Sequence, residues 1–90
     1  MKVHWSNAAR SDLRFVQHTV TCRSNETAAN ALIDRIIART ERLATFPEMG
    51  RLIPDFPGVR ELIVRPYLVR YHIVDGDVEI ISVIHGARAM

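Results

Sequence analysis

The 90-residue chain has a single cysteine, Cys22, and a single lysine, Lys2. One cysteine excludes a disulfide within the chain and leaves no zinc site built on cysteine thiolates. No apolar run approaches the ~18 residues that span a membrane, and residues 1–5 lack the apolar core of a signal peptide. We therefore expect a protein of the cytoplasm.

Glycine is also scarce, and its four residues are scattered singly along the chain. They form no glycine-rich loop that would cradle a phosphate group. The histidines show no metal-ligand spacing, and no Ser-His-Asp arrangement stands out. We expect neither a metal nor another cofactor.

What is present fits one folded domain over residues 1–90, since 48% of the chain is hydrophobic and 24% is charged. A net charge of +2 is too small to indicate a nucleic-acid partner. Apart from Lys2, every basic residue is arginine, which suits planar recognition of carboxylates or phosphates. A GC-rich genome, which encodes arginine freely, is the simpler explanation.

The first half of the chain predicts a short strand followed by two helices. After a strand over residues 1–5, Ser6 or Asn7 caps a helix that runs to about Cys22. Its inward stripe repeats at helical spacing, with Asp12 on the solvated side: Ala9, Leu13, Val16 and Val20. Ser24 or Asn25 caps a second helix that ends near Phe46, before Pro47. The inward stripe of this helix comprises Ala29, Ile33, Ile36, Thr40 and Leu43, widened by Leu32 and Ile37.

The second half predicts a loop over residues 46–58 and strands over residues 59–65, 67–74 and 77–85. Asp75-Gly76 is a strong hairpin signal. A two-residue turn there pairs Tyr71 with Ile80, Val69 with Ser82 and Tyr67 with Ile84. The open face of this hairpin then carries Leu68, Arg70, His72, Glu79, Ile81, Val83 and His85, with His72 and Glu79 as a cross-strand pair. The fold class is α+β, in the order β-α-α-β-β-β, with the helical hairpin on one face of an antiparallel sheet.

Four segments in this order and spacing carry a family resemblance: residues 46–51 (FPEMGR), 58–62 (GVREL), 67–73 (YLVRYHI) and 78–88 (VEIISVIHGAR). Together they resemble toxins of the RelE/ParE superfamily from bacterial type II toxin–antitoxin systems. The resemblance implies a toxin that a cognate ParD-like antitoxin neutralises in a hetero-oligomer. RelE-like members cut mRNA in the ribosomal A site, whereas ParE-like members inhibit DNA gyrase without a hydrolytic site.

Cleavage of mRNA requires acid–base groups and cations that stabilise the phosphorane. For a RelE-like toxin, the resemblance offers His85 as acid or base, and Glu61 is a further base. The available cations are Arg60, Arg65, Arg70 and Arg88. Alternatively, His85 simply ends a strand, held by a neighbouring hydrogen bond.

Leu68 argues against the nuclease, because it occupies the position at which nuclease members commonly carry an arginine facing the phosphate. Arg70 lies two residues further on, and no aromatic residue follows Arg88 in the sequence given. We therefore predict a ParE-like inhibitor of DNA gyrase, with the ribosome-dependent mRNA endoribonuclease as the alternative.

A binding protein of this kind needs partner surfaces. The mixed open face of the sheet predicts an antitoxin site at Leu68, Arg70, Ile81 and Val83. Arginines at positions 51, 60, 70 and 88 suit an acidic protein partner. By analogy with the family alone, we expect the helical hairpin over residues 6–46 to contact gyrase.

Overall fold

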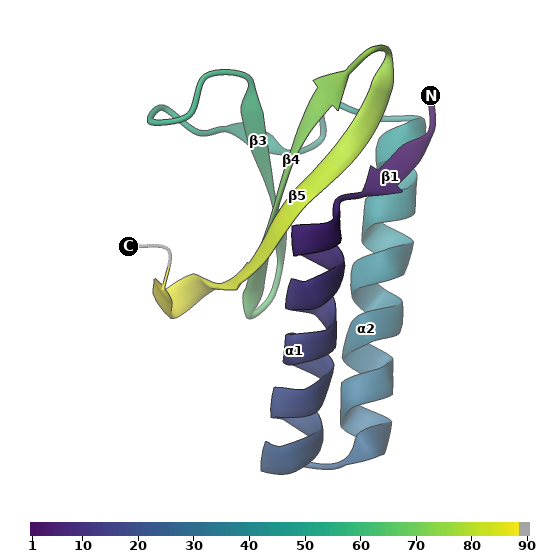
Figure 1. Ribbon diagram of the computed structural model, residues 1–90, viewed down its shortest axis with the longest axis vertical. Coiled ribbons are helices and arrows are strands. Elements are labelled where there is room, and N and C mark those ends of the chain that lie inside the picture. Colours follow the sequence, from purple (N-terminus) through teal and green to yellow (C-terminus); the bar gives the residue numbers. More distant parts are fainter. Residues whose placement is uncertain (89–90) are drawn as a thin grey trace.

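The computed structural model describes residues 1–88 as a helical hairpin beside a five-stranded sheet (Figure 1). The elements in chain order are β1 (Val3–Trp5), α1 (Asn7–Arg23), α2 (Glu26–Glu41), the 3-10 helix η1 (Arg42–Ala44), β2 (Arg51–Leu52), β3 (Val59–Val64), β4 (Tyr67–Val74), β5 (Asp77–His85) and the 3-10 helix η2 (Gly86–Arg88). This is the predicted α+β class. Within residues 1–88, neither helix has the length and apolarity needed to cross a membrane.

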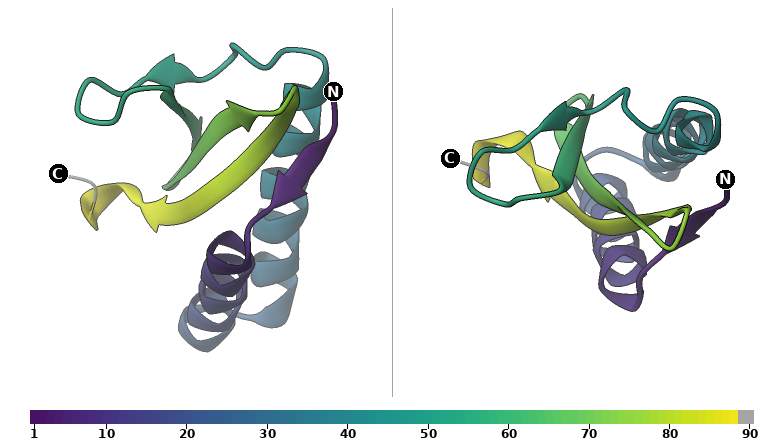
Figure 2. Two further views of the ribbon diagram at one scale, coloured as in Figure 1. Left: turned by 45° about the horizontal axis from the view of Figure 1, so that its top comes forward. Right: turned by 90° about the horizontal axis from the view of Figure 1, so that it is seen from above.

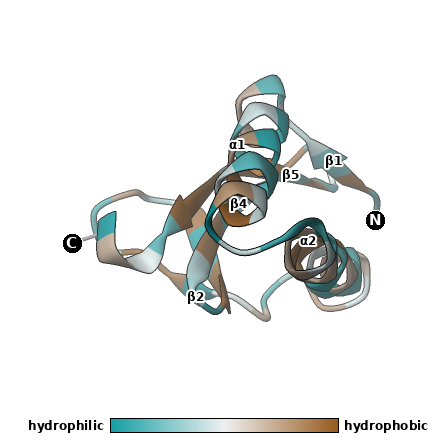
Figure 3. Ribbon diagram, turned by 90° about the horizontal axis from the view of Figure 1, so that it is seen from below, coloured by the Kyte–Doolittle hydropathy of each residue, from teal (hydrophilic) through white to brown (hydrophobic). Residues whose placement is uncertain are grey.

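Both helices begin at a predicted capping residue. The Ser6 hydroxyl accepts a hydrogen bond from the Ala9 amide at 3.0 Å, and the Asn25 side chain accepts one from the Ala28 amide at 2.7 Å. Hydrophilic and hydrophobic segments alternate along each helix (Figure 3), as expected where one face is buried. One residue of the predicted stripe differs, because Ile37 is 36% exposed.

The sheet has the strand order β1-β5-β4-β3-β2 (Figure 2). Strands β3, β4 and β5 pair antiparallel, as predicted, and β2 pairs antiparallel with β3. Strand β1 lies parallel to β5, so the sheet is mixed rather than antiparallel. The alternation of polar and apolar residues marks a strand without giving its direction. Strand β2 was not predicted, because its two residues are too few to show any alternation.

The hairpin of β4 and β5 follows the predicted register only near its turn. Asp75 and Gly76 both have positive φ (53° and 79°), as a two-residue turn requires, and Tyr71 pairs with Ile80. A bulge then shifts the register, so that Tyr67 pairs with His85 rather than Ile84. His72 and Glu79 form the predicted cross-strand pair, at 2.7 Å.

This shift overturns the predicted position of Val83. Val83 is 6% exposed and belongs to the buried cluster on the helix side of the sheet, so its assignment to the open face was wrong. It pairs with Val69, where Ser82 was expected. The ring of His85, also expected on the open face, stands edge-on to that of Tyr67 at 5.3 Å between centroids.

Residues at the start of α1 hold the bulge in place. The Ser6 hydroxyl donates to the carbonyl of Ile81 at 3.3 Å, and the Asp12 carboxylate accepts from the amide of Val83 at 3.0 Å. These side chains supply partners for backbone groups near the bulge. Asp12, expected on the solvated side of the helix, therefore lies against β5.

Candidate functional site

The predicted cationic residues at the β2 end of the sheet surround a buried carboxylate. Glu61 is 4% exposed and bonds Arg51 at 2.8 Å and Arg70 at 3.2 Å. Burial alone would raise the pKa of Glu61, but the hydrogen bonds and charges of the two arginines outweigh it and hold that pKa below its ordinary value. Glu61 is thus an ionised, doubly paired group rather than a base ready to take a proton.

The two arginines predicted as catalytic on these strands are already engaged. The Arg70 guanidinium also lies over the ring of Phe56, 5.5 Å from its centroid. Arg60 donates to the carbonyl oxygens of Gly50 at 2.9 Å and Glu48 at 3.4 Å. Both side chains therefore hold the segment between α2 and β3 against the sheet.

The same segment is held by Tyr71. Its hydroxyl donates to the carbonyl of Pro47 at 2.7 Å and accepts from the amide of Gly50 at 2.9 Å. Burial raises the pKa of Tyr71. Gly50 lies so close that an added Cβ would stand 2.7 Å from the Tyr71 ring and hydroxyl.

The four residues predicted for a nuclease site fall into two groups: Arg60 and Arg70 lie at the loop and Glu61, whereas His85 and Arg88 lie on one groove. Arg60 pairs with Tyr71 in the sheet, and His85 pairs with Tyr67, four residues away along β4. Four strand residues span about 13 Å. His85 accepts a hydrogen bond from the Ala87 amide at 3.1 Å, the structural role considered for it from the sequence. Among residues 1–88, no three His, Cys, Asp or Glu side chains are placed to share a metal ion.

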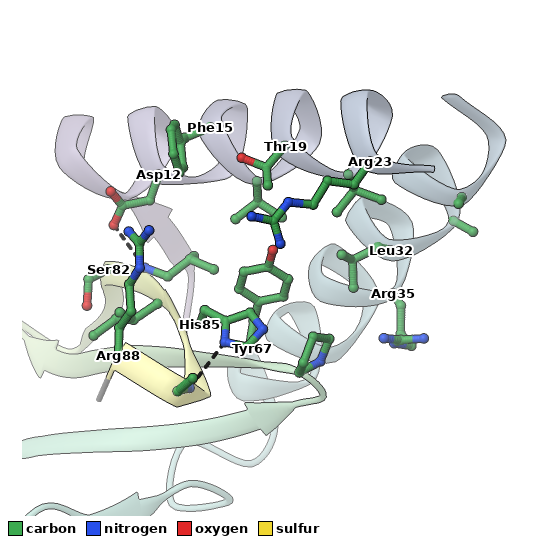
Figure 4. A pocket seen from close by; sticks show the side chains of 18 residues that line it. Asp12, Phe15, Thr19, Arg23, Leu32, Arg35, Tyr67, Ser82, His85 and Arg88 are labelled. Atoms are coloured by element: carbon green, nitrogen blue, oxygen red, sulfur yellow. Dashed lines mark hydrogen bonds between the residues drawn. The ribbon is translucent and has the colours of Figure 1, made fainter. Parts of the chain in front are cut away.

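His85 and Arg88 instead line a groove between the helical hairpin and β5, with a volume of about 920 Å³ (Figure 4). Its apolar lining comes from both helices and the sheet and includes Phe15, Val16, Val20, Leu32, Val83 and Ile84. Arg23, Arg35 and Tyr67 also line it. None of these three, nor Phe15, was predicted as a site residue from the sequence. Phe15 alone could have pointed to this groove from the sequence, because it is a large apolar residue outside the inward stripe of its helix.

The residues predicted to bind an antitoxin are divided between two surfaces. Leu68 and Ile81 are half-buried, and Arg70 lies beside Glu61. Val83, by contrast, lines the groove on the helix side. The predicted set therefore does not form one continuous surface.

Comparison with known proteins identifies the family. The family described as the ParE toxin of the type II toxin-antitoxin system, parDE, matches residues 3–90. The chain belongs to the ParE toxin family. It is similar to Toxin RelE2 of Caulobacter vibrioides, with 34% identity over 97% of each chain. It is also similar to Toxin ParE3 of the same organism, with 36% identity over 72% of this chain and 67% of that protein.

Among solved structures, this ParE-family chain resembles one described as the chromosomal ParDE TA system from P. aeruginosa. The TM-score is 0.84, over 94% of this chain and 95% of the other, with 19% sequence identity. At that identity the likeness establishes the fold. The RelE/ParE-like fold predicted from the sequence is therefore confirmed.

Proposed function

We propose that this ParE-family toxin inhibits DNA gyrase by binding to it, without hydrolytic chemistry of its own. The dispersal of the predicted catalytic residues carries the proposal. Arg60 bonds two backbone carbonyls, Arg70 is paired with Glu61, and His85 lies on the groove. A phosphorane needs cations preorganised around one point. Arg60 and Arg70 are bound elsewhere, so Arg88 is the one predicted catalytic cation that shares the groove with His85.

An antitoxin of the ParD kind neutralises the toxin in this proposal. The matching family and the similar P. aeruginosa structure are both described in terms of a toxin–antitoxin system. A stable complex would also stabilise a domain of this size by mass action. Gyrase and antitoxin would meet the toxin in the cytoplasm.

Ribosome-dependent cleavage of mRNA is the second candidate. The relative named RelE2 aligns with 97% of the chain, and His85 is exposed at the end of β5. An imidazole can both donate and accept a proton. Leu68, in place of the arginine common in nuclease members, counts against this candidate.

One paired assay tests the two candidates. Purified toxin is added to gyrase in a supercoiling reaction and, separately, to ribosomes programmed with mRNA. We expect supercoiling to fall with toxin concentration, the mRNA to stay intact, and His85→Ala to inhibit gyrase as strongly as the parent. Cleavage that disappears in His85→Ala, with supercoiling unaffected, would replace the gyrase proposal by the nuclease.

A further inference from the structure

A single residue of β5 is left out of its ladder with β4. Arg70 pairs with Ser82, and the next residue, Tyr71, pairs with Ile80. Ile81 therefore has no partner across the ladder. This extra residue is the bulge, and it sets every pairing that follows it along β5. If Ile81 joined the ladder, the rest of the strand would move one place, about 3.3 Å, toward its C-terminal end. Two registers are thus open to the strand, the bulged one that the structure shows and a shifted one.

The two registers turn residues 82–85 to opposite faces of the sheet. In the bulged register Val83 lies opposite Val69 and is 6% exposed on the helix side. In the shifted register Ser82 would lie opposite Val69 and take over that buried place. Val83 would turn to the open face, because successive side chains of a strand alternate between the two faces. A shift of one place thus changes the side chains that β5 presents on both faces.

Contributions of opposite sign separate the two registers. The burial of Val83 rather than Ser82 favours the bulged register. In the shifted register Ile84 would replace His85, which is exposed, in the place opposite Tyr67. The unpaired residue of the bulge would also gain a place in the ladder with β4. The shifted register is therefore a competitor, and contacts outside the ladder decide between the two.

Two side chains at the start of α1 hold the bulged register. The Asp12 carboxylate accepts a hydrogen bond from the Val83 amide at 3.0 Å. The Ser6 hydroxyl donates to the carbonyl of Ile81 at 3.3 Å. Figure 4 shows Asp12 directed from α1 toward β5. Within residues 1–88, β1 is the only strand on this edge of β5, and its pairing ends before the bulge. Beyond that point the two side chains take the place of a neighbouring strand.

We propose that residues 82–85 exchange between the bulged and the shifted register, and that Asp12 and Ser6 set the balance in favour of the bulged one. The exchange is a two-state element of the fold, because Val83 faces the helices in one register and the open face in the other. A partner that contacts only one of these faces binds one register more tightly and shifts the population toward it. The two faces of the sheet are thereby coupled, since occupation of one changes what the other presents.

NMR of the isotope-labelled toxin distinguishes the two registers. Cross-strand nuclear Overhauser effects join Val69 to Val83 in the bulged register and to Ser82 in the shifted one. Saturation-transfer exchange experiments measure the minor register, which we expect at about 0.1–10% in the parent. Asp12→Ala should raise the ratio of shifted to bulged register about fivefold to 150-fold, the factor for one buried amide left without its acceptor. Arg14→Ala, on the exposed side of the same helix, is the matched control and should leave the ratio unchanged.

A variant that lacks Ile81 provides the opposite test. Without the extra residue, an unbroken ladder pairs Val83 with Val69, so the deletion should abolish the exchange even in combination with Asp12→Ala. If Asp12→Ala does not fold, Asp12→Asn keeps an oxygen acceptor and should raise the ratio by a smaller factor. A single register in every Asp12 variant that folds, or exchange that persists without Ile81, would overturn the inference. Neither measurement involves gyrase or an antitoxin, so its result is independent of the proposed function.

Discussion

Glu61→Gln tests the charge cluster that joins β2, β3 and β4. The amide keeps the shape of the side chain but removes the charge that Arg51 and Arg70 share. Removing one partner of a fully buried ion pair costs about 3–5 kcal/mol. Here the Arg51 side chain is 68% exposed and is screened by water, whereas that of Arg70 is 20% exposed and is screened only in part. We therefore expect a loss of about 1–3 kcal/mol in the free energy of unfolding at pH 7.

The pH dependence of this loss has a fixed sign. Because the folded state lowers the pKa of Glu61 beneath its ordinary value of 4.5, the unfolded chain takes up the proton first as the pH falls. The stabilisation is complete above pH 4.5 and disappears as the pH falls through the lower folded pKa. The difference in unfolding free energy between the parent and Glu61→Gln should therefore shrink below pH 4.5.

Urea unfolding followed by circular dichroism at pH 7 and at steps down to about pH 3 measures this difference. In thermal melts each kcal/mol should appear as a fall in Tm of roughly 4–8 °C. Arg51→Gln is the control, because it removes one largely exposed pair and should cost about 0–1 kcal/mol. Equal stability of parent and Glu61→Gln at pH 7, or a difference that persists unchanged at pH 3, would refute the assigned role of the carboxylate.

Four further substitutions test the loop, the bulge and the two faces of the sheet. Gly50→Ala brings a Cβ to 2.7 Å from Tyr71 and should cost about 1–3 kcal/mol in urea unfolding; parental stability would show that the loop can move away. Asp12→Ala leaves the Val83 amide without its partner and should cost about 1–3 kcal/mol; rapid hydrogen exchange at that amide by NMR would confirm the contact. Val83→Asp should unfold the domain, whereas Leu68→Asp should cost under about 1 kcal/mol by thermal melting. If Leu68→Asp cost more stability than Val83→Asp, the core would lie on the opposite face of the sheet.

Local signals predicted most of the fold. Ser6 and Asn25 cap the helices because each side chain reaches an amide three residues on, an interaction contained within one helical turn. Asp75 and Gly76 set the hairpin because both accept positive φ. Such features depend on neighbouring residues alone, so the sequence displays them directly.

The bulge in β5 was not predicted, because the side chains that bond to it are remote in sequence. Asp12 lies 71 residues before Val83, and Ser6 lies 75 before Ile81. The alternation of β5 fits either register, since both place apolar residues toward the helices. Without the bulge, Val83 would occupy the open face, and the groove would lose part of its lining. A contact made by α1 therefore determines which side chains β5 presents to a partner.

The charged residues show why the right chemical groups do not by themselves identify a nuclease. The sequence offered a base, several cations and an imidazole, all of the right type. The structure pairs the base Glu61 with the cation Arg70 and joins Arg60 to backbone carbonyls, so charges that would serve a phosphate stabilise one another. The guanidiniums of Arg23 and Arg88 have no carboxylate partner within residues 1–88, and they border an apolar groove. Pairing thus removes Glu61, Arg60 and Arg70 from the groups available to a phosphate, whereas Arg88 and His85 still line one groove.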